Sequence, residues 1–126
     1  MAGEMKLILE ELTNKIISTA IEVHKALGSG FLESIYENAL CKELTLRGIR
    51  FARQHEINVL YKGEIVGTHR LDLIVEEQVI VELKALRSFE DIHYVQLHSY
   101  LKATNLKVGL LLNFGTPTLQ IKRIVN

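Results

Sequence analysis

Two short apolar segments near the middle of the chain carry charged residues that a buried strand does not normally hold. Residues 68–75 and 79–84 consist mostly of β-branched and aliphatic side chains, and three residues separate them. This pattern predicts an antiparallel hairpin. Side chains alternate between the faces of a strand, so Glu82 and Lys84 share one face, and Asp72 joins them in a suitable register. Two acids and a lysine there are costly unless they bind something.

The oxygen atoms of this hairpin suit a hard divalent cation. The carboxylates of Asp72 and Glu82 and the main-chain carbonyl of Leu83 are the ligands that Mg²⁺ prefers, and we expect Mg²⁺ or Mn²⁺. Such a metal polarises a phosphoryl oxygen and lowers the pKa of a bound water. Lys84 would orient or help to activate that water, and Gln96, on the following helix, would hold it through its amide. The alternative is a solvated strand face with a cross-strand ion pair.

The hydrophobic periodicity predicts the rest of the fold. Apolar side chains at three- and four-residue steps indicate helices, and alternating ones indicate strands. The expected helices span 6–27, 31–47 and 89–103, and the expected strands span 54–62, 64–75, 78–85, 108–114 and 119–125. We expect Ile35 to be buried and Ser88 to cap the third helix. The order ααβββαββ predicts an α/β fold (α+β by strand pairing), with a mixed sheet, an antiparallel meander, a crossover helix and helices packed against it.

Length and composition narrow the class of protein. A chain of 126 residues is near the commonest size of one domain. The longest apolar runs are far too short to cross a membrane, and the single cysteine, Cys41, fits a reducing cytoplasm. The formal net charge is zero, whereas most domains that bind nucleic acid carry an excess of basic residues.

Two motifs connect these residues with known proteins. Asp72 followed by Glu82-Leu83-Lys84, on adjacent strands before a helix, resembles the D…ExK core of the PD-(D/E)XK nuclease superfamily. The proline of that name is absent, and Leu71 takes its place. Residues 30–36, GFLESIY, match the GxxExxY pattern for which a family of small bacterial and archaeal proteins is named. The resemblance covers nearly the whole chain and implies a restriction-endonuclease-like core, formed by residues 1–126 as one domain.

The resemblance also implies an activity and further site residues. It points to a metal-dependent nuclease that hydrolyses phosphodiester bonds in nucleic acid, with DNA favoured over RNA. In the superfamily an acid on the first core helix often joins the metal site, and Glu33 matches that acid. The alternative for Glu33 is a cap on its own helix. Tyr36, one turn later, either fills the core or contacts a site acid through its hydroxyl.

Other classes of function fit the same residues. A catalytically silent module that keeps the fold and binds protein or nucleic acid agrees with the neutral charge. A hydrolase of a small phosphorylated molecule is a third candidate. A small single-domain nuclease also often acts as a homodimer, so that two sites address two strands, with the first helix or the last strand as the interface.

Overall fold

The computed structural model describes the backbone of residues 2–126 and the side chains of residues 9–126. Within these residues, helices and strands follow one another in the predicted order ααβββαββ. The helices are α1 (Ala2–Leu27), α2 (Glu33–Leu46) and α3 (Asp91–Thr104), and the strands are β1 (Phe51–Tyr61), β2 (Glu64–Val75), β3 (Val79–Lys84), β4 (Val108–Asn113) and β5 (Gln120–Val125). None of the helices in this part of the chain is long and apolar enough to cross a membrane.

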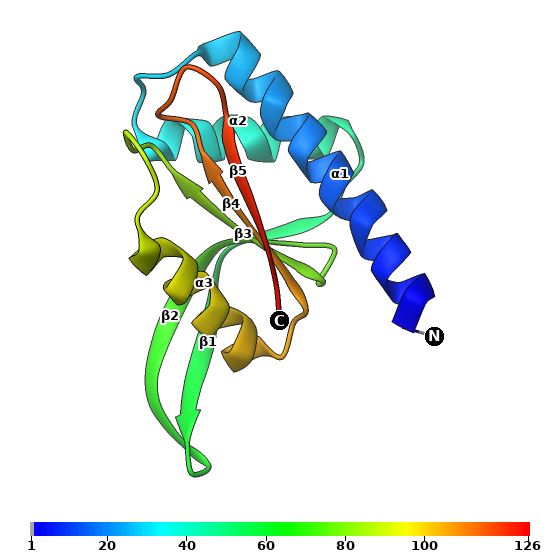
Figure 1. The fold of residues 1–126 in the computed structure, drawn as a ribbon, viewed down its shortest axis with the longest axis vertical. Helices are drawn as coiled ribbons and strands as arrows, with labels where there is room; N and C mark the ends of the chain where they lie inside the picture. The colour runs from blue at the N-terminus through cyan, green and yellow to red at the C-terminus, as the bar shows by residue number, and fades with distance from the viewer. Residues whose placement is uncertain (1) are drawn as a thin grey trace.

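The strands form one mixed sheet in the order β1-β2-β3-β4-β5 (Figure 1). The first three strands are an antiparallel meander, and α3 then carries the chain across to β4, which pairs with β3 in parallel. The last strand, β5, returns antiparallel to β4. The predicted mixed sheet, with its meander and its crossover helix, is therefore confirmed.

Each face of the sheet packs against its own apolar cluster. The larger cluster joins α1 and α2 to one face, and it includes Ile16, Leu40, Leu73, Leu83 and Leu110. The smaller cluster joins α3 to the other face, and its buried members are Ile57, Leu71, Ile80, Leu97, Leu101 and Leu111. All six residues of β4 are buried, because helices cover this strand on both sides.

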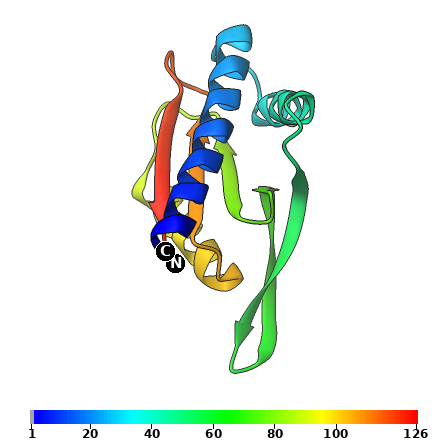
Figure 2. The ribbon, with the colours of Figure 1, turned by 90° about the vertical axis from the view of Figure 1, so that its right-hand side faces the viewer.

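The far half of the β1–β2 hairpin, residues 58–67, extends beyond the helices as an arm (Figures 1 and 2). The arm turns at Lys62 and Gly63, which both have positive φ angles, as a tight type I′ hairpin turn requires. The register shifts between Val59 and Leu60, and Val59 pairs with Gly67. Gly67 therefore lies next to a β-bulge.

Two expected details of the helices are wrong. Ile35 is 39% exposed, and the neighbouring Tyr36 is buried instead. The N-cap of α3 is Glu90 rather than Ser88, so the helix begins later than predicted. The Glu90 side chain accepts the backbone N–H of His93, and the His93 ring accepts the Glu90 N–H at 2.9 Å. This capping box has histidine where the usual pattern has glutamate or glutamine, so the sequence pattern does not reveal it.

Candidate active site

The hydrogen-bonded ladder between β2 and β3 starts at their connecting turn and stops before it reaches Asp72. The pair farthest from the turn is Leu73 with Val81. Beyond it, the Asp72 carboxylate accepts the main-chain N–H of Leu83 at 2.9 Å. The N–H and C=O groups of one strand residue point to the same edge of the strand, so the Leu83 carbonyl also points toward β2. The gap between the strands therefore brings a carboxylate and a main-chain carbonyl to one place.

Strand β1 is interrupted at the same level. Gln54, which the register sets opposite Asp72, makes no ladder pair and has a φ of 47°. Its amide donates to one oxygen of Glu37 at 2.9 Å, and Arg53 donates to the other oxygen at 2.8 Å. Glu37 is a buried residue of α2. Helix α2 therefore holds the kink in β1 that leaves Asp72 without a ladder partner on this side as well.

Glu82 is the most unusual charged group of the site. It is 7% exposed, and among the described residues its Oε1 atom has no hydrogen-bond partner. Burial, followed by a hydrogen bond with Asp72 and the charge of Asp72, raises the pKa of Glu82 to about 9, while Lys84 opposes the rise. A cation placed between the two carboxylates would compensate both the burial and the repulsion.

Glu33 reaches the site from the first residue of α2. The N-cap residue, Leu32, makes no side-chain capping bond, and Glu33 faces the pocket described below. The pKa of Glu33 is raised, first by partial burial and then by the charge of Asp72, while Lys84 lowers it. The acid is therefore near enough to the other charged residues of the site for their charges to act on it.

The GxxExxY segment has a clear structural role. Gly30 has a φ of 119°, which favours glycine. The buried Tyr36 hydroxyl donates to the carbonyl of Gly28 at 2.6 Å and accepts the N–H of Phe31 at 3.1 Å. The tyrosine thus fixes the loop that leads into Glu33. Of the two roles expected for Tyr36, the structure shows the core position, and its hydroxyl bonds the backbone rather than a site acid.

Asn113 fixes the segment that follows Lys84. This fully buried side chain accepts the N–H of Leu86 at 2.8 Å and donates to the Leu86 carbonyl at 3.0 Å. The carbonyl of Lys84 itself accepts the N–H of Phe114 at 2.8 Å. The end of β3 is therefore anchored on the neighbouring loop, and the position of Lys84 is set by buried hydrogen bonds.

A pocket of about 130 Å³ brings the expected side chains together. Glu33, Asp72, Glu82, Lys84 and Gln96 all line it. The other lining residues are His69, Arg70, His93, Leu97, Tyr100 and Leu111. Among the side chains that the structure describes, no three His, Cys, Asp or Glu groups form a ready metal cluster. A cation at the two central carboxylates would therefore take its other ligands from the main chain and from water, as Mg²⁺ commonly does.

Sequence reasoning missed a stacked aromatic pair in this pocket. His69 and Tyr100 stack with ring centroids 4.0 Å apart and an interplanar angle of 15°. Burial, and then the charges of Glu82 and Asp72, raise the pKa of Tyr100, so its hydroxyl stays protonated. Tyr100 lies one helical turn after Gln96, and this spacing is the signal that identifies it. His69 does not share the two-residue alternation of Asp72, so no strand pattern places it there.

Comparisons with known proteins show the superfamily and the fold of the chain. Residues 10–124 match the family model of the PD-(D/E)XK nuclease superfamily. The chain belongs to this superfamily. The fold of the present chain is similar to that in the crystal structure of SSO0001, with a TM-score of 0.55 and 21% sequence identity. The superposition covers 74% of this chain and 49% of SSO0001, so the chain spans about half the length of that protein. No curated protein sequence matches the chain.

Proposed function

We propose that the protein is a Mg²⁺- or Mn²⁺-dependent nuclease that hydrolyses phosphodiester bonds, with DNA rather than RNA as its substrate. The observation that carries the proposal is the meeting of three acids, a lysine and a glutamine at the gap between β2 and β3. Four of these residues, the three acids and the lysine, stand in the D…ExK and GxxExxY motifs, and we further propose that the chain is a member of the GxxExxY family.

Asp72, Glu82 and the carbonyl of Leu83 are the proposed metal ligands. The unpartnered Oε1 atom of Glu82 and the repulsion between the two carboxylates support this assignment, because a cation would satisfy both. When bound, the metal would supply Lewis-acid chemistry at a phosphoryl oxygen. Glu82 must be ionised to act as a ligand, so we expect metal binding to release the proton that the carboxyl holds at neutral pH.

Lys84, Gln96 and Glu33 are the proposed assisting residues. The Lys84 ammonium can orient the attacking water and stabilise negative charge that develops on the phosphoryl group. The Gln96 amide both donates and accepts hydrogen bonds, so it can hold the same water. The Glu33 carboxyl, whose pKa is raised by partial burial and by the charge of Asp72, can hold the attacking water or exchange a proton with it.

The proposal is tested with the only two aspartates of the chain. Purified wild-type protein should cleave DNA in Mg²⁺ or Mn²⁺ and lose this activity in EDTA. Asp72→Asn should abolish cleavage and weaken Mn²⁺ binding in calorimetry. Asp91→Asn is the matched control and should change neither, because Asp91 is exposed at the start of α3 and does not line the pocket. Absence of both metal-dependent cleavage and metal binding in the wild type would refute the proposal.

A catalytically silent nucleic-acid- or protein-binding module is the second candidate. The zero net charge favours it, because the chain has no general cationic excess to hold a substrate. The same experiment separates the two functions. Binding of DNA that is insensitive to Asp72→Asn, without cleavage in either metal, would establish the module and exclude the nuclease.

A further inference from the structure

The arm of residues 58–67 presents apolar side chains that no other described element covers. The exposed fractions lie between 39% and 63% for Val59, Leu60, Tyr61, Ile65 and Val66. The charged residues of the arm are one lysine and one glutamate, so it lacks the cationic excess of an arm that binds nucleic acid. These side chains lie on both faces of the two-stranded arm, and exposed apolar side chains gathered on one projecting segment are typical of a contact with another protein.

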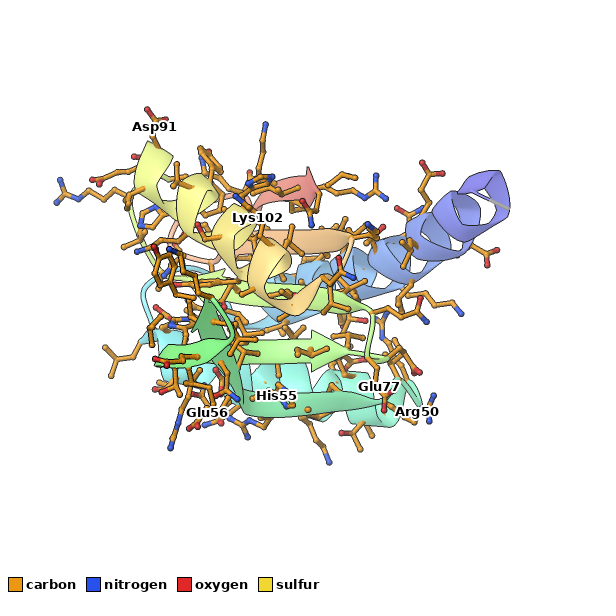
Figure 3. All side chains as sticks on the ribbon, turned by 90° about the horizontal axis from the view of Figure 1, so that it is seen from below. Arg50, His55, Glu56, Glu77, Asp91 and Lys102 are labelled. Carbon is orange, nitrogen blue, oxygen red and sulfur yellow. The ribbon has the colours of Figure 1, made fainter. Side chains whose placement is uncertain are left out.

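A pocket of about 580 Å³ lies at the base of the same hairpin. Apolar side chains from β1, β2 and the chain after α3 line it, among them Phe51, Ile57, Ile74 and Leu106. The charged residues of the lining are Arg50, Glu76 and Glu77, and Arg50 pairs with Glu76 at 3.0 Å. Figure 3 labels Arg50 and Glu77, with His55 farther along β1. The volume is within the range of about 300–1,000 Å³ that is usual for binding pockets.

We propose that the arm of one copy of this chain docks into the base pocket of a second copy, which forms a two-fold symmetric dimer. Two arms that lie antiparallel place each tip at the base of the other hairpin, so both contacts form at once and the assembly is closed. The charges at the contact complement each other at one position. Lys62 at the tip would meet Glu77 of the pocket lining, which has no ion-pair partner among the described residues of its own chain, whereas Arg50 is already paired with Glu76.

The size of this surface suits a dimer. The arm and the pocket lining together offer about 21 residues per copy, and a standard interface uses roughly 20–30 residues a side. The surface differs from the first helix and the last strand, and it shares no residue with the site pocket. The proposal is independent of the proposed nuclease function, because dimerisation does not require cleavage.

Sedimentation of two matched leucine variants tests the dimer. Leu60 on the arm is 63% exposed and Leu46 at the end of α2 is 66% exposed, so a charge is equally tolerable at both in a monomer. The wild type should sediment as a dimer at tens of micromolar. Leu60→Glu should raise the dissociation constant at least about a hundredfold, because the symmetry places the residue in the interface twice. Leu46→Glu should sediment as the wild type does.

Disulfide cross-linking tests the tip-to-base arrangement. Lys62→Cys chains mixed with Glu77→Cys chains should give a covalent dimer on oxidation, and neither variant alone should do so. A wild type that stays monomeric at about 100 µM overturns the proposal, as does a dimer that Leu60→Glu leaves intact. Cross-linking of Lys62→Cys to itself would show tips meeting tips and would also overturn it. A monomer whose DNA binding is lost in Leu60→Glu would assign the arm to nucleic acid instead.

Discussion

The buried carboxyl of Glu82 should make the stability of the protein fall as the pH rises. Its pKa is raised from 4.5 to about 9, by burial first and then by Asp72. Between these two values the folded protein holds a proton that the unfolded chain has lost, so the free energy of unfolding decreases with increasing pH. The slope for one proton is about 1.36 kcal/mol per pH unit. From pH 5 to pH 8 Glu82 alone should therefore lower the free energy of unfolding by about 4 kcal/mol.

Urea unfolding followed by circular dichroism at pH 5, 6, 7 and 8, in EDTA, measures this effect. Glu82→Gln removes the titrating group and keeps the size of the side chain. Its stability relative to the wild type should rise by about 4 kcal/mol across the range. Glu22→Gln, exposed on α1 and outside both pockets, is the control and should follow the wild type. Parallel pH profiles for the wild type and Glu82→Gln would refute the reasoning.

Three further substitutions test the parts that hold the site in place. Gly115→Ala would drive a Cβ atom into the Leu86 carbonyl oxygen, so thermal unfolding should show a loss of about 2 kcal/mol or more, while Gly67→Ala, with no atom within 4 Å, should be close to neutral. Tyr36→Phe should cost about 1–3 kcal/mol in urea unfolding, because two backbone groups of the glycine turn lose their partner. Asn113→Ala should cost about 2–3 kcal/mol by the same measurement and should reduce cleavage.

The sequence was enough to predict the order of the elements and five of the residues that line the site pocket. Helical and strand periodicities differ clearly in this chain, and the run from Val108 to Asn113 is apolar enough to indicate a strand covered on both faces. Acids such as Asp72 and Glu82 within apolar strands are rare enough to indicate a site. Glu33 was predicted as a site residue from the GxxExxY motif and not from periodicity.

The remaining features depend on local irregularities that a periodic pattern cannot express. Strand alternation assumes an unbroken ladder, whereas β1 is kinked at Gln54 by a contact with α2 that is distant in sequence. The kink leaves Asp72 without a ladder partner on β1, and the sequence of the strand alone does not predict it. Likewise His93 closes the capping box of α3 only because its ring happens to reach the Glu90 backbone. Tertiary contacts of this kind decide the fine geometry of the site.

The neutral charge of the chain has a different meaning once the pocket is known. Glu33, Asp72 and Glu82 outnumber the cations Lys84 and Arg70 around the pocket, so ionised carboxylates would repel a phosphate. The pKa of Glu82, raised to about 9 mainly by burial, reduces that repulsion while no cation is bound. A divalent cation would reverse the local field, because it adds two positive charges at the point where a phosphate would approach. The attraction for nucleic acid would then come from the bound metal rather than from the protein surface, which makes zero net charge compatible with a metal-dependent nuclease.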